Sequence, residues 1–256
     1  MSKRKLSWRG ARILVLLTIL GFVAGMTFWE RLWVRSWVRP LQVEVYPVAA
    51  DEAGAAYVST LQAAQFQEIS TFLTHEAERQ WRKTFPPVQL TLAAPVSEVP
   101  PIPSANNALG ALQWSLKLRA YAFRHTPFWH SLGTVRLFVV YHEQREGERL
   151  PHSHGLQKGL LGVAHVFADA GHDAQNNLVI AHELLHTLGA TDKYRAADGQ
   201  PIYPAGYAEP EATPRHPQHQ AELMAGRIAL TAERAEMPQG LGEAVIGDQT
   251  AYEIGW

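Results

Sequence analysis

Residues 178–194, LVIAHELLHTLGATDKY, place two histidines four positions apart in an apolar context. In a helix, His182 and His186 lie on one face a turn apart, so both imidazoles can reach one Zn²⁺ ion. Glu183 lies beside that face, too far round to be a natural ligand but well placed to take a proton from a metal-activated water. Because the surrounding positions are apolar, these groups interrupt a buried pattern, and buried ionisable groups need partners. The stretch therefore predicts a metal-binding helix inside the domain.

A glycine and an aspartate follow this helix at regular spacing. Gly189 lies three residues after His186, and Asp192 lies three residues after Gly189. Glycine adopts positive φ readily, so the chain can turn at the helix end and bring Asp192 back to the ion as a third, oxygen ligand. His216 or His219, in the loop downstream, is the alternative third ligand. The sequence thus predicts a Zn²⁺ site made by the two helix histidines and Asp192.

The spacing HExxHxxGxxDxY resembles that of a known group of zinc peptidases. It is similar to the zincin metallopeptidases of the snapalysin type, relatives of the metzincins in which Asp replaces the third His, and immune inhibitor A peptidases carry a similar helix and turn. Downstream, ELMAG at 222–226 resembles the methionine turn of that group, in which Met224 would lie beneath the metal; an ordinary core methionine is the alternative. The matching positions are His182, Glu183, His186, Gly189, Asp192 and Tyr194.

The resemblance implies a zincin or metzincin-like domain that hydrolyses peptide bonds. Such a domain has a small twisted sheet and two long helices, the second of which bears HExxH above the active-site cleft. Residues 160–167 would be the edge strand to which an extended peptide substrate adds, and 248–256 would be the final helix. Tyr194 either packs, bonds the ligand carboxylate or stabilises an oxyanion. His165, in the expected edge strand, is either structural or faces substrate.

The rest of the chain predicts an α+β domain. The order of strand-like and helix-like segments implies a small mixed sheet beneath helices, with the apolar run at 134–141 as a central strand. In the helix at 106–124, apolar side chains at Leu109, Leu112, Leu116 and Ala120 share one face. Residues 198–219 are rich in Pro, Gly and Tyr and predict irregular structure. The expected strands are 41–45, 88–92, 134–141 and 160–167, and the expected helices are 53–81, 106–124 and one that begins at 174–177.

Composition narrows the chemistry further. The chain has 256 residues, with Lys+Arg 23 against Asp+Glu 24 and a formal net charge of -1, which argues against nucleic-acid binding as its main activity. Cys 0 excludes disulfides, thiolate metal sites, iron–sulfur clusters and a cysteine nucleophile. Any metal ion must therefore be held by His, Asp or Glu. Most of the other histidines are expected to be surface or satisfied core residues rather than ligands, and His152 and His154 are expected in a loop.

The N-terminal segment predicts a membrane anchor. Residues 1–12 are basic and residues 13–29 carry no charge; extension to residue 34, with aromatic flanks, predicts a transmembrane helix over 13–34. Five basic residues precede the uncharged run at 13–29 and three follow it, so the N-terminus is expected in the cytoplasm and the domain at 40–256 is expected to be exported, to the periplasm or outside the cell. A cleaved signal peptide, with small residues at 23–25, is the alternative.

These observations predict a membrane-anchored, exported zinc metalloendopeptidase that acts on protein or peptide substrates. His182, His186 and Asp192 would hold Zn²⁺, and Glu183 would be the general base. The alternative is a catalytically silent zincin-fold module that binds a partner at the cell envelope and carries a structural metal, with a fourth protein ligand such as His216. An anchored scaffold without any metal is a third reading.

Overall fold

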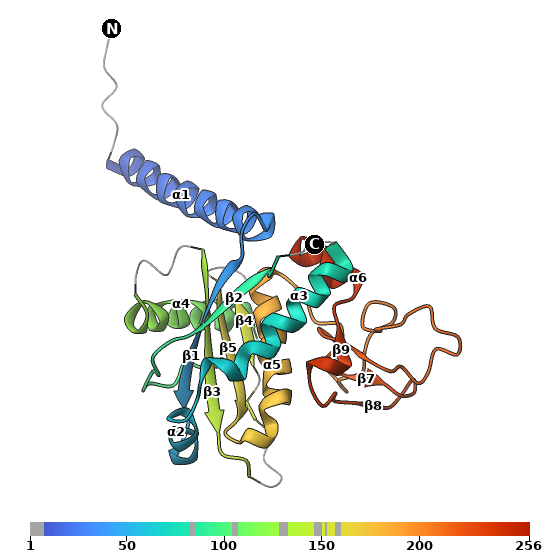
Figure 1. Cartoon of the computed structure of the whole chain (residues 1–256). Coiled ribbons are helices and arrows are strands. Elements are labelled where there is room, and N and C mark those ends of the chain that lie inside the picture. The colour runs from blue at the N-terminus through green and yellow to red at the C-terminus, as the bar shows by residue number, and fades with distance from the viewer. Residues whose placement is uncertain are drawn as a thin grey trace.

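A five-stranded sheet forms the centre of the computed structural model, with strand order β2-β1-β3-β5-β4 (Figure 1). Four strands are parallel and the short β4 runs antiparallel to β5, so the predicted α+β class with a mixed sheet is confirmed. The strands are β1 (Leu41–Ala49), β2 (Val88–Leu92), β3 (Thr134–His142), β4 (His154–Leu156) and β5 (Leu161–Phe167). The structure describes residues 8–81, 85–103, 107–127, 133–145, 150–151, 153–156 and 160–256, without the side chains of Val23, Met26, Thr27, Glu30, Arg31, Ala108 and His154.

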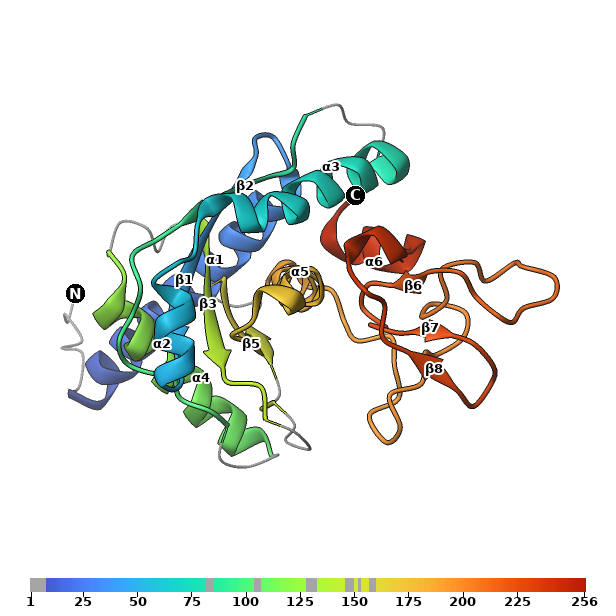
Figure 2. The same cartoon turned by 60° about the horizontal axis from the view of Figure 1, so that its bottom comes forward.

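Helices cover both faces of this sheet (Figure 2). On one face lie α2 (Glu52–Val58), α3 (Gln67–Trp81) and α5 (Asp173–Leu188), and on the other lies α4 (Ala108–His125). Val139 of β3 belongs to the core on the α5 side, whereas its neighbour Phe138 belongs to the core on the α4 side. A strand buried on both faces reads as a continuous apolar run, which is why 134–141 gave so clear a signal.

The outermost strand beside α5 is β4, not β5. Gly162 of β5 pairs with Gly155 of β4, so the prediction that 160–167 forms the edge strand is wrong where β4 covers it. The strand β4 has only three residues, too few for alternation to show in the sequence. His154, expected in a loop, is instead the first residue of β4, where it pairs with Val163, so that prediction is wrong. Its side chain and the whole of His152 lie outside the described residues.

The single helix expected over 53–81 is divided into three elements. The helix α2 ends where Ser59 and Thr60 hydroxyls donate to carbonyls one turn back, at 2.7 and 2.8 Å. A short 3₁₀ helix, η1 (Ala63–Phe66), then begins at Gln62, whose backbone N–H donates to the Gln65 side chain at 2.7 Å. Because side chains of this kind compete with the backbone for hydrogen bonds, the apolar period continued across 53–81 while the helix did not.

In α4 the apolar face seen in the sequence is not the buried one. Trp114, Leu118 and Tyr121 pack against the sheet, whereas Leu112 and Leu116 are 57% and 59% exposed. The helix is apolar on two sides, and the side that carries Trp114 and Tyr121 is the one that meets the sheet.

The helix α1 (Trp8–Ser36) spans the segment predicted to cross a membrane. Among the residues that the structure describes, no helix combines the length and the apolar character that a membrane span requires. The length and apolar character of α1 therefore do not support the predicted anchor at 13–34. The basic residues within 1–7 lie outside the described part of the chain.

The C-terminal end of α1 is part of the domain core. Val34 and Trp37 are buried, and the Trp37 indole N–H donates to the Ile254 carbonyl at 2.9 Å. The Trp37 ring also packs against Trp81 and Trp256, with ring centroids 6.2 and 5.6 Å apart. The first and last helices are thereby joined.

The chain after α5 forms a separate layer of short elements around the end of that helix (Figure 2). The strands β6 and β9 pair in parallel, and β7 and β8 pair antiparallel. The expected final helix is present as α6, and most of 198–219 is irregular, as predicted. The remaining elements are η3 (Ala170–His172), β6 (Ala221–Glu222), β7 (Ile228–Ala229), β8 (Ala235–Glu236), η4 (Leu241–Glu243), β9 (Ala244–Val245) and α6 (Asp248–Ile254).

Candidate metal centre

The helix α5 presents the candidate site while its other side is buried. Ile180, Leu184 and Leu188 are fully buried in the main core. At the start of the helix, the Asn176 side chain accepts from the Phe167 N–H at 3.1 Å and donates to the Phe167 carbonyl at 2.9 Å. This amide joins α5 to the end of β5, so the helix is held at both its side and its beginning.

Both helix histidines are oriented by backbone carbonyls. Nδ1 of His182 lies 3.0 Å from the Leu223 carbonyl, and Nδ1 of His186 lies 2.9 Å from the Ala190 carbonyl. Because a carbonyl oxygen only accepts, each Nδ1 carries the proton and donates. In the neutral imidazole the Nε2 lone pair is then available to a ligand, as in metal-binding histidines whose other ring nitrogen is hydrogen-bonded.

Gly189 turns the chain back towards these two nitrogens. It has φ 107, in the left-handed region, and caps α5 through N–H groups that reach carbonyls of the last turn. Three residues later, Asp192 Oδ1 lies 3.2 Å from His182 Nε2 and 3.1 Å from His186 Nε2. The candidate ligand atoms of these three residues lie within 4.8 Å of one another.

This donor set fits a zinc ion. Two imidazole nitrogens and one carboxylate oxygen are among the ligands that Zn²⁺ takes in catalytic sites, where three protein ligands leave one position open. Ligands at about 2.0–2.1 Å from a tetrahedral ion lie roughly 3.3–3.4 Å from each other. The observed separations of 3.1 and 3.2 Å are close to that value. Burial alone would raise the pKa of Asp192, but the two imidazoles beside it lower that pKa well below its ordinary range, so the carboxylate is anionic.

Glu183 lies next to this group and is 4% exposed. Its Oε2 atom has no hydrogen-bond partner among the described residues. Burial raises the pKa of Glu183, and positive charge on the neighbouring imidazoles would oppose that rise. A buried carboxylate oxygen without a partner is costly, and it marks a position where a ligand or water is expected.

The residues that flank Asp192 are held by Glu253 of α6. Its carboxylate accepts from the Thr191 N–H at 2.8 Å, from the Thr191 hydroxyl at 2.9 Å and from Lys193 Nζ at 2.7 Å. Lys193 Nζ also donates to the Thr191 carbonyl at 2.7 Å, and its backbone N–H donates to the Met224 carbonyl at 2.9 Å. Asp192 is therefore fixed from both sides. We call these bonds of Glu253 to Thr191 and Lys193 the clamp. It was not predicted, because nothing in the local sequence pattern connects Glu253 with residues so much earlier in the chain.

The outer strand β4 lies directly against α5 at the site. A Cβ at Gly155 would overlap the Cβ of His186 and would lie 3.0 Å from the Glu183 carbonyl oxygen. Only glycine allows so close an approach. The sheet edge beside the candidate ligands is thus formed by β4.

Tyr194 and Met224 lie near the site in different ways. The Tyr194 hydroxyl hydrogen-bonds to Asp192, and burial, together with the negative charges of Asp192 and Glu183, raises the pKa of Tyr194. Met224 is fully buried in the main core. In the segment that resembles the methionine turn, the contact with the candidate ligands is made by the Leu223 carbonyl.

The other histidines considered from the sequence lie elsewhere. His216 Nε2 is 3.0 Å from the Tyr207 hydroxyl, and His219 is paired with Glu209 at 3.0 Å. Neither belongs to the group of His182, His186 and Asp192 that the described residues form. His165 Nδ1 lies 2.8 Å from His142 Nε2.

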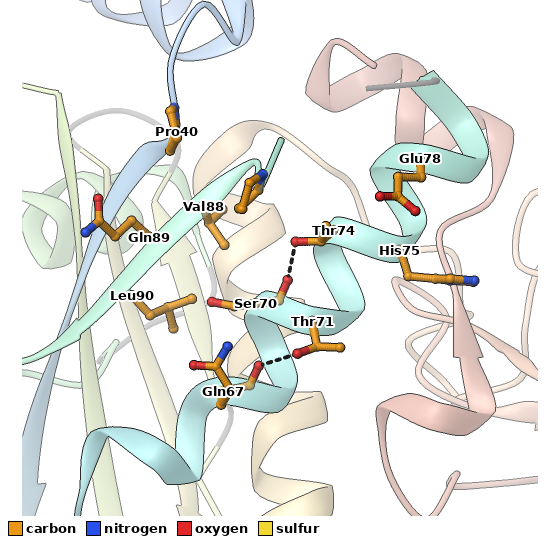
Figure 3. Close-up of a pocket in the computed structure, with 11 residues that line it drawn as sticks. Pro40, Gln67, Ser70, Thr71, Thr74, His75, Glu78, Val88, Gln89 and Leu90 are labelled. Carbon is orange, nitrogen blue, oxygen red and sulfur yellow. Dashed lines mark hydrogen bonds between the residues drawn. The ribbon is translucent and has the colours of Figure 1, made fainter. Parts of the chain in front are cut away.

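A groove elsewhere on the molecule lies away from this site. It has a volume of about 590 Å³ and lies between α3 and β2 (Figure 3). The hydroxyls of Thr71 and Thr74, which line it, donate to carbonyls of their own helix, at 3.1 and 2.7 Å. None of the candidate metal ligands lines this groove.

No family model and no curated protein matches this chain. Among solved structures, it is similar to wild-type OgpA from Akkermansia muciniphila, with 14% identity, a TM-score of 0.39, and coverage of 83% of this chain and 58% of that chain. It is also similar to catalytically inactive OgpA in complex with an O-glycopeptide substrate (glycodrosocin), with 13% identity, a TM-score of 0.35 and the same coverage. The chain spans less than two thirds of the length of these structures. The resemblance to the snapalysin type, which rests on the sequence motif, stays a prediction.

Proposed function

We propose that this chain is a zinc-dependent metallopeptidase. The observation that carries the proposal is the convergence of two imidazole Nε2 atoms and Asp192 Oδ1 beside a buried carboxylate, Glu183. Both imidazoles donate a hydrogen bond from Nδ1 to a backbone carbonyl, which leaves Nε2 available to bind a metal ion. A structural site would not require Glu183, and it would normally have a fourth protein ligand.

His182, His186 and Asp192 would hold the ion. Zinc bound there would supply a Lewis acid that activates water and polarises a carbonyl. Glu183 would accept a proton from the water that attacks the scissile carbonyl and would deliver a proton to the amine as the C–N bond breaks. The burial that raises the pKa of Glu183 suits this exchange, because it makes the carboxylate a stronger proton acceptor than an exposed one.

The proposed substrate is a protein or peptide in an extended conformation. The strand β4 lies at the sheet edge beside α5, where an extended chain can pair with it through main-chain hydrogen bonds. Such pairing is independent of sequence and would bring a peptide bond alongside the candidate ligands. The edge strand predicted at 160–167 is replaced in this role by β4.

The proposal is tested by comparing two variants of the full chain. Glu183→Gln is nearly isosteric but cannot accept the proton, so it should bind one zinc like the wild type and cleave an unstructured protein substrate about 10²–10⁴-fold more slowly. Asp192→Ala removes a ligand and should weaken zinc binding itself. Metal analysis of the purified proteins and a cleavage assay are the two measurements.

Each outcome is decisive for one part of the proposal. A wild-type protein that binds no zinc, or a Glu183→Gln variant with wild-type turnover, would refute the peptidase mechanism. Retention of zinc by Asp192→Ala, with loss in His216→Ala or His219→Ala, would show that the third ligand comes from the downstream loop.

Location is a separate part of the proposal. We propose that the domain is exported with its N-terminus in the cytoplasm, as the basic residues at 1–12 and the apolar run at 13–29 predict. A reporter that is active only outside the cytoplasm, fused after Trp256, should be active. Activity of a cytoplasm-only reporter at the same position would overturn the topology and leave the metal chemistry untouched.

A further inference from the structure

An apolar stripe runs along the outer face of α4. Leu109, Leu112, Leu116 and Phe123 are 64%, 57%, 59% and 65% exposed. At about 3.6 residues per turn these positions fall on one side of the helix. Large apolar side chains that are exposed singly need no explanation, but a contiguous row of them marks an interaction surface.

The stripe cannot be hidden by a rotation of the helix. The opposite side of α4 is held against the sheet by Trp114, Leu118 and Tyr121, which are buried. The Trp114 indole N–H donates to the Pro101 carbonyl at 2.6 Å, and the Tyr121 hydroxyl donates to the Glu98 carbonyl. These bonds also fix the neighbouring loop, in which Ile102 is 60% exposed. The exposed face is therefore a fixed part of the surface.

The charges beside the stripe have one sign. The helix contains no Asp or Glu and carries Lys117, Arg119 and Arg124. With successive residues rotated by about 100°, Arg119 lies on one side of the stripe and the other two lie on the opposite side. Glu98, in the adjacent loop, pairs with His125 at 2.9 Å and approaches Arg124 at 3.9 Å. The border of the stripe is thus basic.

We propose that this face of α4 binds the surface of an anionic lipid bilayer. A helix with an apolar face and basic borders lies in the membrane interface, with its apolar side chains below the headgroups and its cations at the level of the phosphates. A second copy of the chain suits the surface less well, because pairing two stripes would bring the basic borders together. The proposal is independent of the metal chemistry and adds a second membrane contact to the one predicted for α1.

The chain has Cys 0, so a single cysteine can be labelled without background. A nitroxide at Leu116→Cys in the full chain reports on the stripe alone, whatever α1 does. A nitroxide at Glu211→Cys is the matched control, because Glu211 is exposed and its segment lies away from α4 in both views (Figures 1 and 2). Collision rates with oxygen, which concentrates in lipid, and with a water-soluble nickel chelate are measured with and without vesicles.

With vesicles of phosphatidylcholine and phosphatidylglycerol, the oxygen-to-nickel ratio at Leu116→Cys should rise several-fold, to a depth of about 5–10 Å, and the control should not change. The rise should shrink when the phosphatidylglycerol is left out or when Lys117→Glu is added. An unchanged ratio at Leu116→Cys would overturn the proposal. Immobilisation of that label without vesicles, increasing with protein concentration, would overturn it in favour of a second copy.

Discussion

Gly155 is the residue at which the sheet approaches the candidate ligands most closely. Because a Cβ there would overlap the Cβ of His186, Gly155→Ala should displace α5 or β4. Overpacking of this kind costs about 1–3 kcal/mol. We expect a lower free energy of unfolding and, since the strain falls on a ligand, weaker zinc binding. Chemical denaturation and zinc competition against a chelator measure the two effects.

The matched control is Gly242→Ala, since a Cβ at Gly242 meets no atom within 4 Å and the residue does not need positive φ. Its stability should stay within about 0.5 kcal/mol of the wild type. Equal zinc affinity in Gly155→Ala and Gly242→Ala would show that the approach of β4 does not constrain the site.

At the scale of single residues, most of the candidate site could be predicted from the sequence. The placing of Asp192 beside the two histidines followed from the left-handed turn that Gly189 permits, and the structure has that turn. Gly155 and the carbonyls of Leu223 and Ala190 could not be predicted. Backbone carbonyls are present at every residue, and the need for glycine at 155 depends on which strand lies against α5.

Among the helices, α6 is the one that positions the third candidate ligand. Removing the negative charge in Glu253→Gln keeps the size of the side chain but weakens its bonds to Thr191 and Lys193. Partners outside the ligand set typically change metal affinity by about 10–100-fold when they are mutated. We expect a loss of zinc affinity in that range, measured by chelator competition.

Glu236→Gln, at an exposed position, controls for the loss of one charge and should bind zinc like the wild type. If both variants keep wild-type zinc affinity while Glu253→Gln melts at a lower temperature, Glu253 is only structural and the clamp does not position Asp192.

The same carboxylate predicts a pH dependence of stability. Burial alone would raise the pKa of Glu253, but bonds from Lys193 and Thr191 outweigh it and lower the pKa. Since the folded pKa lies below the unfolded value of about 4.3, the stabilisation is complete above that pH and is lost as the pH falls through the folded pKa. The difference in melting temperature between wild type and Glu253→Gln should be constant near neutral pH and vanish in acid. A difference that persists at the lowest pH would contradict this assignment.

Secondary structure was predictable where a single apolar period dominated. The helix α5 and the strand β3 lie where their patterns placed them. The pattern was misleading where side chains compete with the backbone, as at Gln62, and where a helix is apolar on two sides, as in α4. In α4 the period gives the helix but does not decide which face meets the sheet.

For the whole molecule, the α+β class could be predicted from the sequence, but which helices and strands lie side by side could not. The strand order β2-β1-β3-β5-β4 depends on crossovers over the sheet, which leave no local signal. The contact between the two ends of the chain likewise leaves no local signal in the sequence. Trp37 and Ile254 are joined by a hydrogen bond, although the sequence assigned the tryptophan to the border of a membrane anchor.

This contact between the two ends predicts how the domain depends on its N-terminal helix. Trp37 is 3% exposed and packs against Trp81 and Trp256, so Trp37→Ala would leave a cavity and an unpaired Ile254 carbonyl. Truncating a buried tryptophan costs about 3–5 kcal/mol. We expect a loss of that size in urea unfolding of the full chain, monitored by circular dichroism.

Trp29→Ala is the matched control, because Trp29 is 66% exposed in α1, the helix that ends just before Trp37, and its replacement should change stability by no more than about 0.5 kcal/mol. Cleavage at 23–25 would leave Val34 and Trp37 in place, so a chain that starts at Met26 should unfold like the full one. A chain that starts at Pro40 lacks both buried side chains and should be destabilised at least as much as Trp37→Ala. If it instead unfolds like the full chain, the packing of α1 against α6 contributes nothing to the domain, and residues before 40 serve only for targeting.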